Sequence, residues 1–365
     1  MAGAAAQDDA EQLLHLKLAF LAGEPPACIL ALARKAGGGS ITPHVQKFLL
    51  ENCTDTNVYG RQNSTYTTTI FKRIISEVEL SSDIVIDALY EEFAQRMLSK
   101  AKDSLLNKTN HIYKEISFLS STHDNVSSSL ISVVARLSCS SNMLEGDTGC
   151  SLWPSSLFLS EFILSYPEIF STKCCFELGS GVGLVGICLN YVGASKVILT
   201  DGDTSTLTNM KENMELNNVC IKLEDFEELK ESKNKVECKY LSWEEASESD
   251  LRGYQPDIVL GADIVYDPVC VPHLVRVLSM LLRRDSKQGE VNRKSGDELE
   301  MDGPVAYIAT VVRNAETFNC FAKAAADAKL SAINIGSSTA PSNFLPYMLS
   351  YDRSSVQLLK ITLSS

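Results

Sequence analysis

The chain has 365 residues, with 33 basic and 46 acidic side chains, a net charge of −13 and a hydrophobic content of 45%. This length predicts roughly two domains with ordinary cores. The acidic balance argues against a nucleic-acid surface, because phosphate binding relies on Lys and Arg, and it would suit a basic segment of a protein partner better. No membrane span, secretory signal or transit peptide is recognisable, so we expect a cytoplasmic protein. The eleven cysteines form no C-x-x-C pair, which predicts reduced thiols rather than disulfides or a metal site.

Residues 1–110 predict a separate helical domain. Leucines from Leu13 to Leu21 form one stripe, and Pro25-Pro26 and Thr42-Pro43 open two further helices. Ser82-Asp83 predicts the N-cap of the last helix. The apolar face expected for that helix is formed by Val85, Ala88, Leu89, Phe93 and Met97. No pattern with catalytic chemistry occurs here, so we expect either a cap on the next domain or a docking surface that helps to select a partner.

Residues 111–150 are rich in β-branched and serine residues and predict a β-hairpin that leads into a domain spanning residues 151–365. Trp153 follows on a loop before the first helix of that domain. It is a candidate to cover a cationic sulfonium or an adenine ring by cation–π contact or stacking, and a core position is the alternative.

A buried strand predicted over residues 174–178 runs into a glycine-rich turn, a helix and a second strand at residues 196–200 that ends on Asp201. The glycines of the turn are Gly179, Gly181 and Gly183. Strand, glycine turn, helix, strand and terminal acid form half of a nucleotide-binding unit, in which the acid accepts hydrogen bonds from ribose hydroxyls.

Two cofactors compete for this pattern. The motif G-x-G-x-x-G begins at Gly181 and Asp201 lies about twenty residues beyond it, as a nicotinamide-dependent dehydrogenase requires. Glu177 argues against that interpretation, because a carboxylate aimed into the pocket repels the phosphates of a dinucleotide. Its charge suits S-adenosylmethionine, which carries a sulfonium and an ammonium group and no phosphate.

Two later strands end in further candidate site residues. The strand at 236–241 precedes Trp243, where a loop would wrap the base of the nucleotide. The strand at 256–261 runs directly into Ala262 and Asp263, with Tyr266 three residues further on, and these residues are expected to flank the pocket of the methyl donor. Seven strands are predicted in all, at residues 174–178, 196–200, 236–241, 256–261, 305–312, 330–335 and 356–363, the final pair antiparallel.

These segments resemble the seven-strand protein-lysine methyltransferases, whose signature after the fourth strand is Asp-x-x-Tyr. The resemblance is carried by Glu177-Leu-Gly-Ser-Gly-Val-Gly-Leu-Val-Gly, Leu152-Trp153-Pro154, Leu241-Ser242-Trp243, Ala262-Asp263-Ile-Val-Tyr266 and Arg313-Asn314. With its helical N-terminal region, the chain is similar to the FAM86-type members, whose activity is methylation of a lysine in translation elongation factor 2. Relatives commonly have Asp at the position of Ser242, so the acidic contact to adenine is expected to be absent or supplied by Glu244.

The resemblance implies an α/β fold of the class I, Rossmann-like type, S-adenosylmethionine as cofactor and elongation factor 2 as protein substrate. It implies that Asp263 orients the incoming lysine and that Tyr266 walls the lysine channel. The cofactor would be bound by Trp153, Glu177, Gly179, Gly181, Gly183, Asp201, Trp243 and Ala262. Two alternatives stay open: a methyltransferase-fold adaptor without activity, and the nicotinamide-dependent dehydrogenase.

Overall fold

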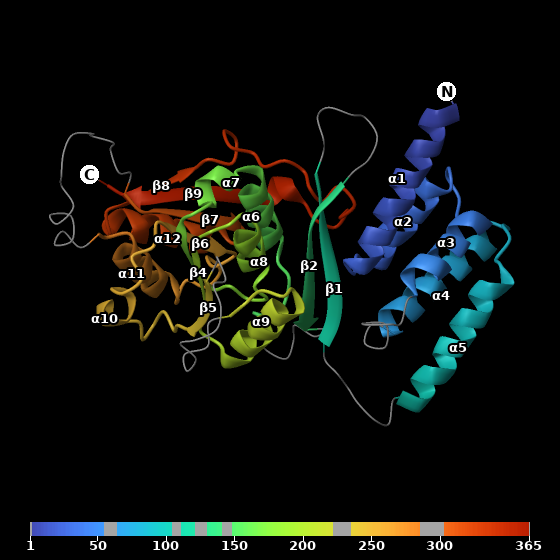
Figure 1. Ribbon diagram of the computed structural model, residues 1–365, viewed down its shortest axis with the longest axis horizontal. Coiled ribbons are helices and arrows are strands. Elements are labelled where there is room, and N and C mark those ends of the chain that lie inside the picture. Colours follow the sequence, from blue (N-terminus) through green and yellow to red (C-terminus); the bar gives the residue numbers. More distant parts are fainter. Residues whose placement is uncertain are drawn as a thin grey trace. The chain divides into compact units, whose positions relative to one another are not determined.

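The computed structural model describes residues 2–54, 64–103, 111–120, 130–140, 148–221, 235–284 and 303–364. The chain divides into two compact units (Figure 1). The first contains residues 1–145 together with 343–351, and the second contains 146–342 together with 352–365. The hairpin residues therefore belong to the same unit as the N-terminal helices. The functional roles assigned to residues 1–110, 111–150 and 151–365 stay predictions.

Five helices make up the first part of the first unit. They are α1 (Ala2–Leu21), α2 (Pro26–Ala36), α3 (Pro43–Cys53), α4 (Ser64–Leu80) and α5 (Asp87–Asp103). Proline occupies the first turn of α2 and of α3, where its missing N–H costs no hydrogen bond. Thr42 caps α3 by accepting a hydrogen bond from the backbone N–H of Val45 at 3.4 Å.

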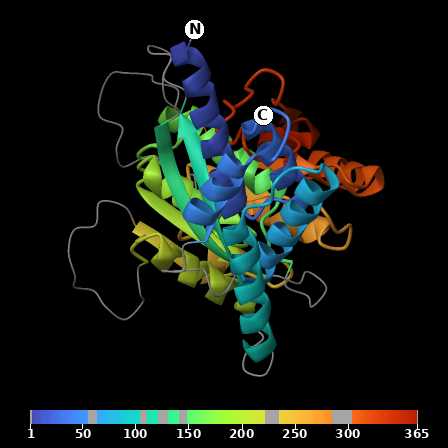
Figure 2. The same ribbon diagram turned by 90° about the vertical axis from the view of Figure 1, so that its right-hand side faces the viewer.

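The expected start of α5 is wrong, and its predicted apolar face is only partly buried. Ser82 has a left-handed backbone with φ of 57°, and the N–H of Asp83 donates to the carbonyl of Val78 at 3.1 Å, so these residues end α4 instead of capping α5. Leu89 is fully buried, whereas the side chain of Met97 is 49% exposed. Figures 1 and 2 show the carboxyl-terminal part of α5 projecting beyond the other helices of this unit.

The predicted hairpin is confirmed as the antiparallel pair β1 (His111–Ser120) and β2 (Leu130–Ser140), seen as two long strands in Figure 2. Residues 343–351 complete this unit. The buried Tyr347 hydroxyl accepts from the N–H of Ser117 at 2.8 Å and donates to the Ser117 carbonyl at 3.0 Å. Glu24 accepts from the N–H and the hydroxyl of Ser350 at 2.9 and 2.6 Å, so a segment far along the chain satisfies buried polar groups here.

The second unit is built on a seven-stranded sheet, and all seven predicted strands are present. They are β3 (Cys174–Leu178), β4 (Lys196–Asp201), β5 (Lys235–Tyr240), β6 (Ile258–Ala262), β7 (Val305–Val311), β8 (Leu330–Asn334) and β9 (Val356–Leu363). Their order is β5-β4-β3-β6-β7-β9-β8. The first five strands in this order are parallel, and β9 runs antiparallel to both of its neighbours, as expected for the final pair. This is the class I, Rossmann-like α/β fold.

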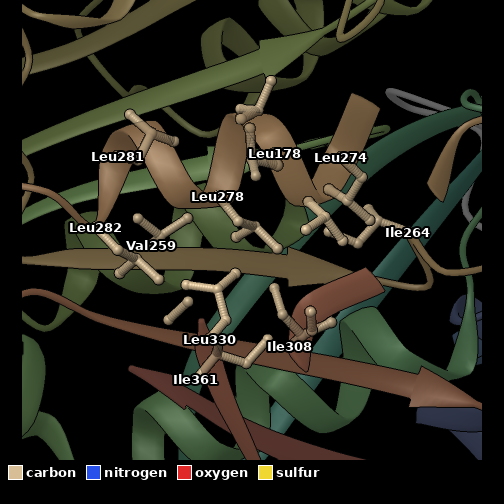
Figure 3. Close-up of a cluster of buried hydrophobic side chains, with 14 of the residues drawn as sticks. Leu178, Val259, Ile264, Leu274, Leu278, Leu281, Leu282, Ile308, Leu330 and Ile361 are labelled. Atoms are coloured by element: carbon tan, nitrogen blue, oxygen red, sulfur yellow. The ribbon is translucent and has the colours of Figure 1, made fainter. Parts of the chain in front are cut away.

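Helices cover both faces of the sheet (Figure 1). They are α6 (Pro154–Ser165), α7 (Pro167–Phe170), α8 (Leu184–Tyr191), α9 (Thr204–Leu216), α10 (Glu248–Leu251), α11 (Val271–Leu281) and α12 (Ala315–Asp327), and a 3₁₀ turn at Arg353–Ser355 precedes β9. On one face, leucines of α11 such as Leu274 and Leu278 pack against Val259 and Ile308 of the sheet (Figure 3). Within the described ranges, no helix has both the length and the apolar character that crossing a bilayer requires.

Candidate active site

A cavity of about 490 Å³ opens at the carboxyl ends of β3, β4 and β6, inside the second unit. In a parallel sheet, ligands bind at such ends where neighbouring connections leave in opposite directions, and β3 lies between β4 and β6. Eight of the predicted site residues line this cavity. They are Trp153, Gly179, Gly181, Asp201, Trp243, Ala262, Asp263 and Tyr266.

The glycine turn after β3 is shaped for a close approach. Gly179 and Gly181 have φ angles of 62° and 53°, which side chains with a Cβ rarely adopt. A Cβ on Gly179 would lie 2.9 Å from Ile264 and 3.4 Å from the Trp243 ring. The turn therefore presents bare backbone at the floor of the cavity, where a ligand can approach it.

Asp201, at the end of β4, is held by the backbone on both sides. Its carboxylate accepts from the N–H of Gly181 and from the N–H of Asp203, each at 3.1 Å. Burial raises the pKa of Asp201, and these backbone hydrogen bonds oppose that shift. The carboxylate thus braces the glycine turn in addition to facing the cavity, where a ribose would lie.

Gly183 and Glu177 do not line the cavity among the described residues. Gly183 is the residue before α8, and an added Cβ would lie 2.6 Å from Met214 of α9, so its role is close helix packing. Successive side chains of a strand point to opposite faces. Phe176 and Leu178 pack in the core beneath α11, so the side chain of Glu177 lies on the opposite face of the sheet. On that face lies Cys188 of α8. Burial raises the pKa of the Cys188 thiol, and the nearby Glu177 raises it further.

Glu177 is an unusual buried acid. Its side chain is 1% exposed, and Oε2 has no hydrogen-bond partner among the described residues. Burial raises its pKa to about 8, against a smaller lowering by a hydrogen bond from Ser180. A buried acceptor without a partner calls for an explanation. A cationic ligand bound at the adjoining glycine turn would stabilise the ionised form of this acid. We expected Glu177 to reach into the cavity, but strand alternation places it beneath the turn.

Both tryptophans lie at the cavity. Trp153 precedes α6, and its indole N–H donates to the Thr148 carbonyl at 3.0 Å. Trp243 follows β5, and its carbonyl accepts from the guanidinium of Arg276 at 2.8 Å. The Trp153 ring is therefore anchored through its own N–H, whereas at Trp243 the hydrogen bond holds the backbone. Both indole rings offer an apolar face to a flat or cationic ligand.

Asp263 follows β6 directly and is the most constrained acid of the site. Its φ is 55°, its side chain is only 6% exposed, and its N–H donates to the Ala309 carbonyl at 2.9 Å. Oδ1 accepts from the N–H of Val311 at 3.1 Å. Tyr266, three residues further along the chain, is 62% exposed and also lines the cavity.

The sequence assigned no role to Arg313, which the structure places at the site. Its two terminal nitrogens donate to both carboxylate oxygens of Asp263 at 3.2 and 3.1 Å, and its guanidinium carbon lies 5.1 Å from the Trp153 ring centroid. Thr148, Cys270 and His273 also line the cavity without having been predicted. The sequence did contain a signal for Arg313, because this residue follows the end of β7, and β7 is parallel to β6 and next to it in the sheet.

The chemistry of the lining fits S-adenosylmethionine. Among the described lining residues the carboxylates are Asp201, Asp203, Glu244 and Asp263, and the guanidinium of Arg313 is already paired with one of them. Such a cavity attracts a cationic ligand and repels a pyrophosphate, which disfavours a dinucleotide. Glu244, beside Trp243, also lines the cavity. It is the residue that the sequence suggested as an acidic contact for adenine.

Comparison with known proteins agrees with this geometry. Residues 134–298 match the model of a family described as lysine methyltransferase. This segment is therefore similar to the lysine methyltransferase family. The match contains β3, the glycine turn, Asp201 and Asp263, and it ends before β7 and Arg313.

Relatives of the lysine methyltransferase segment extend the comparison. An uncharacterised protein of Dictyostelium discoideum is 36% identical over 232 residues, which is 59% of each chain. The human protein-lysine N-methyltransferase EEF2KMT is 30% identical over 177 residues, 48% of this chain and 49% of the relative. A putative methyltransferase of known structure complexed with SAH has a TM-score of 0.37 at 12% identity, and the alignment covers 75% of this chain and 67% of that one. The chain thus spans about half to three-fifths of the length of the first two relatives.

Proposed function

We propose that this chain transfers methyl groups from S-adenosylmethionine to a lysine side chain of a protein. The observation that carries the proposal is the acidic cavity at the ends of β3, β4 and β6, which combines a bare glycine turn with two tryptophans. The match of residues 134–298 to the lysine methyltransferase family model supports it.

The residues of the cavity divide between the two reactants in this proposal. Asp201 would bind the ribose hydroxyls, the Gly179–Gly181 backbone would hold the amino-acid end, and Trp243 and Ala262 would border the adenine. Glu177, beneath the turn, would contribute only its charge. When bound, the cofactor supplies an activated methyl group on a sulfonium. Asp263 and Tyr266 would orient the lysine nitrogen, since transfer by in-line displacement depends on alignment worth about 7 to 11 kcal/mol.

We propose translation elongation factor 2 as the substrate, which places the reaction in the cytoplasm. The resemblance to FAM86-type enzymes supports this choice, as do relatives named EEF2KMT in Homo sapiens and Mus musculus. The net charge of −13 favours a basic face on the partner, and complementary charge should make association sensitive to salt.

We also propose that residues 1–110 help to select the substrate, because a lysine channel alone cannot distinguish one protein from another. The apolar side chains of Met97 and Leu98 on α5 are 49% and 69% exposed. Replacing both with Asp should raise KM for elongation factor 2 about tenfold without changing kcat. Ile333→Asp, at an equally exposed apolar position on β8, is the matched control. An equal KM for both variants would rule out the docking role of α5.

The proposed activity is tested by incubating the purified chain with tritiated S-adenosylmethionine and a cytosolic extract that lacks this activity. We expect one labelled band that purified elongation factor 2 reproduces, with the label on lysine. Cofactor binding without any labelled band would identify an adaptor. Tight binding of a nicotinamide dinucleotide in calorimetry, in place of S-adenosylmethionine, would identify a dehydrogenase.

A further inference from the structure

The carboxylate of Asp263 is already engaged in the structure. Oδ1 accepts from Val311 and from Arg313, and Oδ2 accepts from Arg313 alone, which makes the Arg313 pair bidentate. One lone pair of Oδ2 is left for a further donor. The Asp263 side chain is 6% exposed and that of Arg313 is 45% exposed, so the pair is buried on the acid side and open on the guanidinium side.

The position of the pair within the cavity connects it to the lysine substrate. Direct contacts join the lining residues into two parts: Asp201 contacts the glycine turn through the N–H of Gly181, and Arg313 contacts both Asp263 and the Trp153 ring. The guanidinium carbon of Arg313 lies 5.1 Å from the centroid of the Trp153 ring. This cation–π contact holds the guanidinium group in place over the ring. If the cofactor takes the first part, the lysine approaches through the second.

The proposed transfer needs a neutral amine. The lysine ammonium first loses a proton to solvent, and its nitrogen then forms an N–C bond while the C–S bond of the cofactor breaks. The electron pair of that bond stays on sulfur, giving a neutral thioether and a methylated ammonium. An unpaired carboxylate beside the lysine would stabilise the ammonium and so raise its pKa, which opposes the loss of the proton.

We propose that Arg313 is a positioning residue that neutralises Asp263, so that the carboxylate orients the substrate lysine without holding it as an ammonium. The inference rests on the proposed lysine methyltransferase function. Arg313 acts through Asp263 and aims its remaining Oδ2 lone pair at the amine. A purely structural pair would join the ends of β6 and β7 and leave the ionisation of the substrate unaffected.

The test is the pH dependence of kcat for purified elongation factor 2, measured between pH 6 and pH 10 for the wild type and Arg313→Gln. The midpoint of the rising limb should move up by about one to three pH units in the variant. At pH 7 kcat should fall about tenfold or more, since each unit is a factor of ten in the neutral amine. KM should not rise, because the unpaired carboxylate attracts the ammonium.

Two variants separate charge from geometry and from stability. Arg313→Lys keeps the positive charge, so its midpoint should stay near that of the wild type while kcat falls through loss of the bidentate contact. Arg353→Gln removes the 2.9 Å pair with the buried Glu161 elsewhere in the same unit and should leave the midpoint unchanged. Arg313→Met replaces Arg313→Gln if the latter does not melt cooperatively. The remaining titratable groups of the lining are the same in every variant: Asp201, Asp203, Glu244, Tyr266, Cys270 and His273.

A second readout does not depend on activity. In a Trp243→Phe background Trp153 is the sole tryptophan, and Arg313→Gln should change its emission because the guanidinium lies against the ring. An unchanged emission, or an unchanged pH midpoint with active enzyme, overturns the inference. A wild-type chain that binds S-adenosylmethionine but labels no protein overturns the proposed function itself, and this outcome is seen before any variant is compared.

Discussion

Replacing Asp263 with alanine should reduce methyl transfer about 100-fold or more while leaving the affinity for S-adenosylmethionine nearly unchanged. The carboxylate lies beyond the end of β6, at the part of the cavity assigned to the lysine. Among the described residues its hydrogen bonds go to Val311 and Arg313, not to the glycine turn. Its removal takes away the acceptor that aligns the amine. The measurement is single-turnover transfer of tritium to elongation factor 2, together with calorimetric titration of the cofactor.

The control for this variant addresses the contacts that Asp263 makes within the protein. Alanine leaves the N–H of Val311 and the guanidinium of Arg313 without their acceptor. Asp263→Asn keeps one carbonyl oxygen and the same shape, so it should preserve the melting temperature better than alanine and still lose most of the activity. If both variants lose cofactor affinity together with transfer, Asp263 has a structural or cofactor-binding role instead.

Glu177→Gln should make the stability of the cofactor-free protein less dependent on pH. Burial raises the pKa of Glu177 from 4.5 to about 8 in the folded chain. Between these values the unfolded chain has lost the proton and the folded chain retains it, so stability falls as pH rises through this window. The slope contributed by this one group approaches about 1.4 kcal/mol per pH unit. Glutamine is neutral throughout and removes that contribution.

The measurement is the melting temperature of both proteins at intervals from pH 4.5 to pH 9. The two curves should start together at the acidic end, with the variant increasingly more stable up to about pH 8 and the difference constant above it. Curves that run parallel over the whole range would contradict the raised pKa. Adding S-adenosylmethionine should stabilise the wild type more than the variant near pH 8, because a cation near the turn favours the ionised acid.

Local sequence patterns were sufficient to predict the strands of the sheet. The central strands are short and mostly apolar runs, as at residues 174–178, and such runs are buried where the sheet is covered on both faces. The glycine turn and Asp201 followed from spacing along the chain, because strand, turn and helix are neighbours in sequence. Eight of the ten predicted site residues line one cavity. All of them except Trp153 lie at or just after strand ends, and parallel strands end at the same edge of the sheet.

The expectations that failed depend on which way a side chain points or what covers it. Glu177 was expected in the pocket, but strand alternation sends it beneath α8. On α5, helical periodicity places the apolar residues on one side but does not determine what covers that side, and Met97 is exposed to solvent. Ser82-Asp83 has the composition of a cap, but tertiary packing uses it to end the preceding helix.

By itself the sequence determined the α/β class, the seven strands, the position of the glycine turn and the acids at the strand ends, since all of these are encoded in short stretches of neighbouring residues. Only the tertiary structure decided that Arg313 neutralises Asp263 and that residues 343–351 complete the helical unit around Tyr347. Arg313 is fifty positions from Asp263 and Tyr347 is 230 from Ser117. Contacts over such separations arise when the sheet assembles and carry no signature in local periodicity.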